Sequence, residues 1–472
     1  MSTVNVSTTT ELLSALGAAS PGDRIALAPG RYDGVTLRNY EFDGTVTITS
    51  ADPNDRAVFD DNVWIFDSAG LAFEQVDFIM ADLADAFWVP AVRLQGTENV
   101  RMSDVTIAGQ LADETNGLSM SEFGAPGIAD GPIEEMAWGT GMWISQSTGT
   151  VLEQIEIRDF VDAIHLNVTT DTRISHAHLH HLRSDGIKLS NTTDTVIEHS
   201  LFHSNQPAFP PNALHRADHG DFLQAYVLNQ PIGIDGLTVR GNVFAQGDGR
   251  PTHTFFGALT LDSPRADEVS FTDIEISDNL VHTAHIWGFA LFDSQDITLE
   301  HNTLLPAPAD PTFYNSTGGV PFIAIGAASP DPDYGDAPVN VLVSDNRTVG
   351  DAVSYRNNDA TQTPVNVVID GNTVHSNDPQ DSDYWGTALP GTEGAIVPRA
   401  DDLRIGQDGV GIRALDPWLV DWLNNPWDTV EQPVEGGEGN DLLEADDTGL
   451  KIFGHGGNDT LVGGSVIYTL YG

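Results

Sequence analysis

The stretch Asp162-Ala-Ile-His-Leu166 recurs in altered form as Asp185-Gly-Ile-Lys-Leu189 and as Asp221-Phe-Leu-Gln-Ala225. In each copy an acidic residue leads into a short apolar run, and one position changes its character: His165, Lys188 and Gln224. Side chains alternate between the two faces of a strand, so the changing residue and its apolar neighbours lie on opposite faces. The pattern predicts successive coils of a solenoid, with the three changing residues in one outward row.

Short alternating segments separated by turn residues continue to about residue 375. Five of them are followed at once by asparagine and an apolar residue, at Asn242, Asn279, Asn302, Asn346 and Asn372. Asparagine tolerates left-handed backbone angles and bonds its own turn, so stacked copies predict an asparagine ladder. Hairpin turns in a β-sandwich are the alternative. A register held through five repeats favours the solenoid.

The two ends of this region read as caps. Residues 9–19 predict a short amphipathic helix with Thr9 or Thr10 as its N-cap, and the turn-rich stretch PGDRIALAPGRY follows at 21–32. Residues 376–433 lose the repeat, and we expect Trp418, Trp422 and Trp427 to pack on the last coil.

The N-terminal arrangement resembles the cap and first coil of right-handed parallel β-helix proteins, among them polysaccharide lyases of the chondroitinase B and alginate lyase type. The resemblance implies an all-β fold: a right-handed parallel β-helix with an N-terminal capping helix. We expect this unit at residues 1–427, a linker at 428–434 and a further domain at 435–472.

The charge balance excludes several classes of partner. The 472 residues include 20 basic and 69 acidic ones, for a formal net charge of −49. Nucleic-acid binding needs a basic footprint and is not expected; nor is binding to an anionic membrane. No run of 18 apolar residues is present, so no membrane insertion is expected. The chain has no cysteine, which rules out disulfides and thiol chemistry.

The C-terminal domain carries a metal-binding motif. Gly436-Gly-Glu-Gly-Asn-Asp441 and Gly454-His-Gly-Gly-Asn-Asp459 lie 18 residues apart and match the G-G-x-G-x-D pattern of calcium-binding β-roll repeats. Glycines permit the tight turns, and carboxylate and carbonyl oxygens are the hard ligands that Ca²⁺ prefers. The sequence predicts calcium as a cofactor, held in a short roll by Asp441, Asp459, Gly437, Gly439 and Gly457.

These repeats resemble those of proteins that bacteria export by type I secretion and that fold in external calcium. The resemblance implies an extracellular protein, although the N-terminus lacks the basic and apolar regions of a secretory signal. We expect a monomer.

The outward row is the candidate active site. Alignment of the strands extends it to Trp143, His165, Lys188, Gln224 and Thr260, with a second line two residues on at Ser145, Asn167, Ser190, Tyr226 and Asp262. Gly141, Ala163 and Gly186 are expected to leave the surface beside the row open to a flat substrate. Coils lie about 4.8 Å apart, so we expect Lys188 to lie next to His165 and close to Tyr226.

Basic residues are concentrated around this row. The loop before Gln224 contains His215, Arg216 and His219, and Arg183 lies nearby in sequence with His180, His181 and His203. A cationic region on an acidic protein suits an acidic polysaccharide, whose carboxylates need local positive charge. We expect Trp143, His165, Arg183, His215, Gln224, Asp185 and Asp221 to bind this substrate.

Cleavage of a uronate polymer by β-elimination needs three groups: a cation for the C6 carboxylate, a base for the C5 proton and an acid for the leaving O4. We assign the carboxylate to Arg216, Gln224 and His165, the base to Lys188 or His219, and the acid to Tyr226. A calcium ion on Asp162, Asp185 or Asp221 is an alternative source of charge; those carboxylates can equally bond turn amides.

The sequence predicts a secreted polysaccharide lyase that acts on a uronate polymer, most readily alginate. The β-helix and β-roll together resemble alginate lyases and mannuronan C-5 epimerases. The epimerases' Asp-Pro-His motif is absent, and Asp218-His219-Gly220 is only a loose counterpart. An epimerase, a polygalacturonase-like hydrolase that uses Asp185 and Asp221, and a non-catalytic carbohydrate-binding β-helix are the alternatives.

Overall fold

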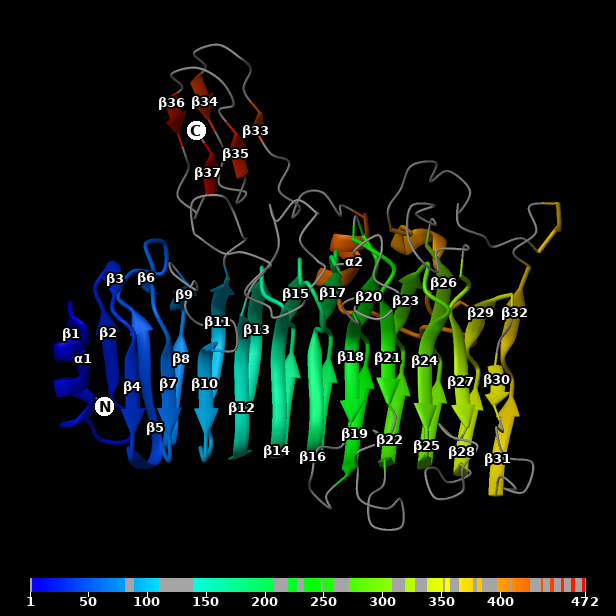
Figure 1. Ribbon diagram of the computed structural model, residues 1–472, viewed down its shortest axis with the longest axis horizontal. Helices are drawn as coiled ribbons and strands as arrows, with labels where there is room; N and C mark the ends of the chain where they lie inside the picture. The colour runs from blue at the N-terminus through cyan, green and yellow to red at the C-terminus, as the bar shows by residue number, and fades with distance from the viewer. Residues whose placement is uncertain are drawn as a thin grey trace, which may run out of the picture.

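The computed structural model of the chain describes residues 2–80, 89–109, 139–207, 220–226, 233–247, 249–257, 271–307, 319–326, 338–350, 353–356, 365–376, 380–383, 397–407, 409–424, 434–435, 442–444, 451–453, 460–462 and 469–471. Thirty-two strands join one continuous sheet that winds into a solenoid, and every pairing between its described strands is parallel. Figure 1 shows these strands stacked along one long axis, from blue β1 to yellow β32.

Three parallel ladders of strands form the sides of the solenoid, and we name them sheets I, II and III. Sheet I contains β1 (Thr3–Val6), β2 (Arg24–Leu27), β5 (Glu41–Ser50), β8 (Ala69–Glu74), β11 (Arg101–Ala108), β13 (Val151–Arg158), β19 (Ile234–Arg240), β22 (Phe271–Ser277), β25 (Ser294–Glu300), β28 (Val339–Ser344) and β31 (Val365–Asp370). The C-terminal parts of β14 (Asp162–Ser175) and β16 (Ile187–Glu198) also belong to it.

Sheet II contains β3 (Gly30–Tyr32), β6 (Ala57–Phe59), β9 (Asp77–Ile79), the ends of β11 and β13, β15 (His178–His180), β17 (Leu201–His203), β20 (Val243–Ala245), β23 (Leu280–Thr283), β26 (Thr303–Pro306), β29 (Arg347–Val349) and β32 (Thr373–His375). Sheet III contains β4 (Val35–Arg38), β7 (Val63–Phe66), β10 (Pro90–Gln95), β12 (Thr140–Thr148), the starts of β14 and β16, β18 (Asp221–Tyr226), β21 (His253–Gly257), β24 (Trp287–Phe292), β27 (Phe322–Gly326) and β30 (Val353–Arg356).

The predicted right-handed parallel β-helix is therefore confirmed. Alternation along each strand sends one set of apolar side chains inward, where they form one long core that runs from Val6 to Val343. Parallel sheets bury their inner face throughout, which accounts for the many Val, Ile, Leu and Phe residues in short strands.

The asparagine ladder is also confirmed. Asn242, Asn279, Asn302 and Asn346 are fully buried, and each side chain oxygen accepts from the backbone nitrogen of the preceding rung or turn at 2.9–3.0 Å. Asn372 completes the series by accepting from the Asn346 backbone at 2.9 Å. Contrary to expectation, the left-handed residue is not the asparagine itself but the residue before it, such as Asp278 with φ 56° or His301 with φ 57°.

The N-terminal helix is confirmed as α1 (Thr9–Leu16), with its cap one residue earlier than expected. The Thr8 side chain accepts from the Glu11 backbone nitrogen at 3.2 Å. Glu11 in turn accepts from the Ser7 backbone nitrogen at 2.7 Å. These bonds satisfy the Glu11 amide in the first turn of the helix and the Ser7 amide just before the cap.

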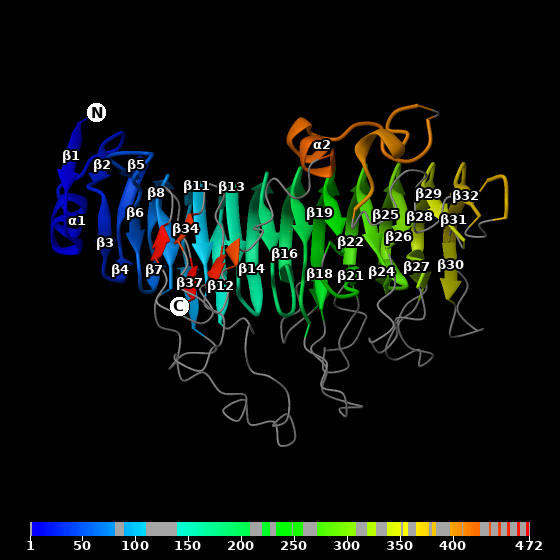
Figure 2. The same cartoon turned by 90° about the horizontal axis from the view of Figure 1, so that it is seen from above.

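The predicted packing of the C-terminal tryptophans on the last coil is wrong. The 3₁₀ helix η2 (Ala400–Asp402) and the helix α2 (Pro417–Asn424) lie along the outer face of sheet II, over Leu201, Val243, Leu280, Leu305 and Val349 (Figures 1 and 2). Trp422 is buried there against His203, and Trp418 donates to the His199 carbonyl. An apolar outer face on sheet II explains this placement. Trp427 lies outside the described residues.

The C-terminal strands form a separate small roll. β33 (Val434–Glu435), β35 (Lys451–Phe453) and β37 (Thr469–Tyr471) make one parallel sheet, and β34 (Leu442–Glu444) pairs with β36 (Thr460–Val462) in another. Every register step is 18 residues, for example Leu442 to Thr460. The predicted stacking of two nine-residue units per turn is confirmed. No helix among the described residues has the length and apolar character needed to span a membrane.

Candidate functional site on sheet III

The outward row on sheet III has the predicted register. Trp143 pairs with His165, His165 with Lys188, and Lys188 with Gln224, on four successive coils. The row also extends toward the N-terminus, because Arg93 pairs with Trp143 and Trp64 pairs with Arg93. Six neighbouring coils thus present one outward line of aromatic, cationic and polar side chains.

The predicted fifth member of the row is wrong. Gln224 pairs with Phe256, not with Thr260, because the next strand of sheet III is His253–Gly257. Gly257-Ala-Leu-Thr-Leu261 looks like a further copy of the repeat, but Phe255 already takes the buried core position next to Leu223. Thr260 and Asp262 lie outside the described residues.

The second outward line is confirmed through four coils. Ser145 pairs with Asn167, Asn167 with Ser190, and Ser190 with Tyr226. Tyr226 is partly buried, and burial together with the Asp162 and Asp185 carboxylates raises its pKa above the ordinary value although Lys188 opposes them. Its phenol therefore holds its proton at neutral pH.

The small residues beside the row do not open the surface, contrary to expectation. Ala163 belongs to the buried core, and an added side chain on Gly141 would meet the Ile157 side chain and the Ala163 carbonyl at 2.7 Å. Gly186 faces Phe202 and the Phe222 carbonyl in the same way. These positions point inward, where the bulky aromatic side chains of neighbouring coils require them to be small.

Lys188 is the centre of the row. Its ammonium lies 2.9 Å from Asp162 Oδ1 on the neighbouring coil and 2.9 Å from Asp185 Oδ2 on its own. The lysine side chain is 18% exposed, whereas the two carboxylates are buried. The chain contains only two lysines, Lys188 and Lys451, so this one is not part of a generally basic surface. A solvated surface lysine is therefore excluded for Lys188.

The aspartates that lead into the strands form a ladder of their own. Asp162 Oδ1 accepts from the Asp185 backbone nitrogen at 3.1 Å, and Asp185 Oδ1 accepts from the Asp221 backbone nitrogen at 2.8 Å. The carboxylates therefore accept hydrogen bonds from turn amides, which was one of the two roles expected for them. They also hold the side chains of the row, because each carboxylate has a second oxygen that faces outward.

Burial and mutual repulsion set the protonation of this cluster. Burial, with the nearby Asp162 and Asp221 carboxylates, raises the pKa of Asp185 to about 7 against the attraction of Lys188. Burial acts on Asp162 too, but the Lys188 ammonium and the His165 hydrogen bond outweigh it and hold its pKa below the ordinary value. Burial disfavours the ammonium form of Lys188, and the two carboxylates more than compensate, so its pKa is raised. At neutral pH Lys188 is a cation.

Two further side chains of the row are oriented by the same ladder. His165 Nε2 lies 3.0 Å from Asp162 Oδ2, and the ring packs against Trp143 with centroids 4.8 Å apart. Gln224 Nε2 donates to Asp221 Oδ2 at 3.1 Å. A carboxylate that accepts from one ring nitrogen of a histidine fixes the orientation of the ring and, in the neutral ring, the tautomer.

The predicted cationic region is smaller than the sequence suggested. Arg183 is buried in the turn between β15 and β16, and His180 and His203 are buried on the outer face of sheet II, so none of them lies on the outward row. Burial also lowers the pKa of His203 well below its ordinary value, which keeps that imidazole neutral. Arg216, His215 and His219 lie outside the described residues.

Sequence reasoning missed three members of the site: Arg93, Asp162 as the ion-pair partner of Lys188, and His253. Arg93 stands in Pro90-Ala-Val-Arg-Leu-Gln95, which has the same alternation as the later copies but no leading aspartate. His253 Nδ1 lies 2.6 Å from Asp221 Oδ1 and occupies the strand position that pairs with Asp221. The alternation of apolar and polar residues could have identified Arg93 as a member of the outward row. No sequence feature near His253 indicates its contact with Asp221.

The donor atoms at this row do not fit a calcium site. Calcium takes six to eight oxygen ligands, whereas the ladder's carboxylate oxygens are directed at an ammonium, a histidine, an amide and backbone nitrogens. The ammonium of Lys188 lies where a cation between Asp162 and Asp185 would bind. In the β-roll, Leu442 pairs with Thr460, and the residues directly before them in the sequence are Asp441 and Asp459. Asp441, Asp459, Gly437, Gly439 and Gly457 themselves lie outside the described residues.

Solved structures similar to this chain share its solenoid fold. No protein-family model and no curated protein sequence matches the chain. The PL6 family alginate lyase AlyGC aligns with 95% of this chain at 13% identity and a TM-score of 0.44. A mannuronic acid specific polysaccharide family 6 lyase from human gut microbiota covers 91% at 12% identity with a TM-score of 0.44, and a rhamnogalacturonan lyase covers 88% at 12% identity with a TM-score of 0.46. The matched region is 64% of AlyGC and the full length of the other two lyases.

Proposed function

We propose that this protein is a secreted polysaccharide lyase that cleaves a uronate-containing polymer, most readily alginate, by β-elimination. The observation that carries the proposal is the Lys188 ammonium between two buried aspartates, in an outward row that also contains His165 and Arg93. A long row of this kind, one residue per coil, suits an extended anionic chain that lies along the solenoid axis.

The reaction removes the C5 proton of a uronate, forms the C4–C5 double bond and expels the 4-linked sugar as its O4 takes up a proton. The C5 proton becomes acidic only when the adjacent carboxylate is neutralised. We assign this neutralisation to Lys188, because its raised pKa keeps it cationic. The same raised pKa argues against Lys188 as the base, a role that the sequence alone left open between Lys188 and His219.

We assign the base to His165. Asp162 accepts from Nε2 of this ring, so Nδ1 is the nitrogen able to take a proton. Tyr226 is the candidate acid for O4, since its raised pKa keeps the phenol protonated. Gln224 and Trp143 bind the sugar in this proposal, and Asp221 positions the Gln224 amide. Arg183 is buried away from the row and takes no part, and the loop residues Arg216, His215 and His219 stay candidates for substrate binding.

Asp185 couples the site to pH. Its pKa of about 7 lies near neutrality, so it gains a proton readily when an anionic substrate approaches. Protonation of Asp185 releases one of the two ion pairs that hold Lys188 and frees the ammonium for the substrate carboxylate. Substrate binding should therefore take up a proton.

Calcium belongs to the β-roll in this proposal. The 18-residue register supports a stacked series of identical turns, and bound calcium would supply the charge that their Asp441 and Asp459 need in order to pack. Folding in external calcium would accompany export from the cell, and we expect an extracellular monomer.

The test is incubation of the purified protein with alginate, pectate and glycosaminoglycans while ultraviolet absorbance of unsaturated uronates is followed. New absorbance with shorter chains supports the lyase. A change in uronate composition by NMR without chain cleavage would instead make the protein an epimerase. New reducing ends without absorbance would make it a hydrolase, and binding without any product a carbohydrate-binding protein.

A further inference from the structure

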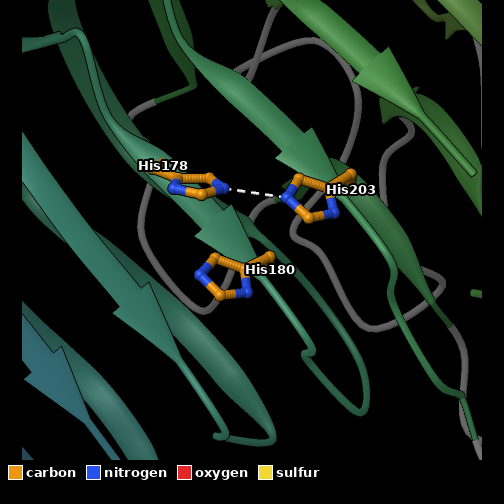
Figure 3. Close-up of side chains that lie close together, drawn as sticks. All are labelled: His178, His180 and His203. Carbon is orange, nitrogen blue, oxygen red and sulfur yellow. Dashed lines mark hydrogen bonds between the residues drawn. The ribbon is translucent and has the colours of Figure 1, made fainter. Parts of the chain in front are cut away.

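A second cluster of ionisable side chains lies on a different side of the solenoid. His178 and His180 are alternate residues of β15, so both project from the outer face of sheet II, while Leu179 between them is buried in the core. His203 on β17 pairs in register with His180 on the next coil. Figure 3 shows the three imidazoles from these two strands grouped together.

The ring nitrogens of these histidines lie at metal-binding separations. Their candidate ligand atoms all lie within 4.8 Å of one another, and His178 Nε2 lies 2.8 Å from His203 Nε2 (Figure 3). Three nitrogens bound tetrahedrally to zinc lie about 3.4 Å apart, given bonds of about 2.0–2.1 Å. The observed separations bracket this value. The His180 and His203 rings are parallel within 3°, so the His180 ring must turn for all three nitrogens to point at one ion.

Neighbouring groups hold the His180 and His203 rings in place. Glu156 Oε1 on β13 lies 3.1 Å from His180 Nε2, and Ser204 Oγ lies 2.7 Å from His203 Nδ1. The Ser204 contact directs His203 Nε2 toward His178. A carboxylate or hydroxyl on the far nitrogen of a ligating histidine fixes its tautomer and ring orientation. His181 adds a fourth imidazole, with its Nδ1 2.6 Å from His180 Nδ1.

The surroundings favour the neutral imidazoles that bind metals. His203 is 2% exposed and His180 is 7% exposed, and Trp422 of α2 packs over the His203 ring at 5.1 Å. Burial lowers the pKa of His178 to about 4 and holds that of His203 well below its ordinary value. Glu156 is the nearby carboxylate, while Arg158 and His181 are the neighbouring groups that oppose a further positive charge. Neutral imidazole is a preferred ligand of zinc, copper and nickel and a poor one for calcium.

We propose that His178, His180 and His203 bind one divalent transition-metal ion of the zinc class. The ion would join two adjacent coils of sheet II beneath α2. This site is distinct from the row on sheet III and from the calcium β-roll.

The experiment uses the full chain without a histidine tag, kept in excess calcium and titrated with Zn²⁺ and, separately, with Co²⁺. We expect one equivalent of zinc to bind, a zinc-dependent rise in Tm, and visible absorption bands of cobalt in a tetrahedral or five-coordinate nitrogen site. His203→Ala should weaken zinc binding at least tenfold, and His178→Asn, at a partly exposed position, should do the same with less risk to folding.

His282→Ala is the matched control. His282 lies in the same outward row of sheet II, two coils beyond His203 with Ala245 between them, and it is also buried with a pKa lowered to about 4. Its removal should leave zinc affinity unchanged. The proposal is overturned if the wild-type chain binds no zinc, or if both cluster variants bind as the wild type does. It is equally overturned if zinc binding is lost only in His455→Ala, which would move the ion to the β-roll.

Discussion

The Lys188 ammonium lies 2.9 Å from the Asp162 carboxylate of the neighbouring coil, and this contact joins two turns of the solenoid through a buried charge. Asp185 holds the same ammonium from the other side at 2.9 Å. The two carboxylates raise the pKa of Lys188 and so keep its side chain protonated. The arrangement therefore places a fixed positive charge on a protein whose formal net charge is −49.

Replacement of Lys188 by methionine should lower stability as well as activity. Two buried carboxylates would lose their shared cation, which costs about 3–5 kcal/mol of unfolding free energy when a buried pair is broken from one side. The cost should shrink as pH falls, because protonated carboxylates no longer need a partner. Urea unfolding of both proteins at several pH values measures this. A loss that does not depend on pH would contradict the charge argument.

Arg101→Ala is the control for that measurement. Arg101 forms an ion pair with Glu153, but both side chains are exposed, at 50% and 37%. Exposed pairs contribute about 0–1 kcal/mol, so this variant should unfold nearly as the wild type does. A similar loss in both variants would mean that burial does not distinguish the two ion pairs.

Much of the fold followed from local sequence, and the limits have physical causes. Period-2 alternation identified the His165–Lys188–Gln224 register because every coil repeats the same inward and outward choice. The strand after it was placed four residues too late, since the residues after Gly257 have the same alternation and long loops vary freely in length. The position of α2 could not be predicted, because an apolar outer face on sheet II becomes visible only when distant strands are stacked. Asp162 as the partner of Lys188 was missed although the two coils were predicted to be adjacent, because alternation does not give the direction of a side chain that leads into a strand.

Asp185→Asn should change the pH dependence of stability and of activity. The folded pKa of Asp185 is about 7, above its unfolded value of 3.8. A raised carboxyl pKa means that folding favours the protonated form. The contribution to stability is therefore greatest below pH 3.8 and falls as the pH rises to about 7. Asparagine cannot ionise, so the difference in Tm between variant and wild type should become more positive from pH 4 to pH 7.

The same variant should extend activity to higher pH. The neutral amide that replaces the Asp185 carboxyl group leaves Lys188 with one carboxylate partner, as protonated Asp185 does in the wild type. Initial rates of uronate cleavage across pH should therefore fall later on the alkaline side. If the alkaline limb of the variant coincides with that of the wild type, Asp185 does not gate Lys188.

His165→Asn tests the assignment of the base. Loss of a general base typically lowers kcat by about 10²–10⁴-fold, and substrate affinity should change far less. Steady-state kinetics on the polymer that the wild type cleaves give both quantities. Asn167→Ala is the matched control, since Asn167 lies two residues further along the same strand on the second outward line. Equal kcat losses in the two variants would mean that His165 has only a positioning role.

The asparagine ladder should contribute strongly to stability. Asn302 donates to the Ile276 carbonyl at 2.9 Å and accepts from the Asn279 backbone and side chain at 3.0 and 2.9 Å. Asn302→Ala would leave several of these buried groups unsatisfied, each at about 1–3 kcal/mol. Thr170→Ala removes one exposed hydroxyl pair with Thr193 and should change stability by less than about 0.5 kcal/mol. Denaturant midpoints compare the two; similar shifts would contradict the ladder's role.

Calcium removal should unfold the β-roll and leave the β-helix folded. The roll strands are two or three residues long and pair only at 18-residue steps, so we expect this small unit not to offset its chain entropy without a bound metal. The β-helix has a continuous core and its own asparagine ladder, neither of which uses calcium. Limited proteolysis with and without a chelator should therefore release the segment after residue 427 while the solenoid stays intact. Asp441→Ala with Asp459→Ala should reproduce this cleavage in the presence of calcium, and their resistance to it would refute calcium binding at these two positions.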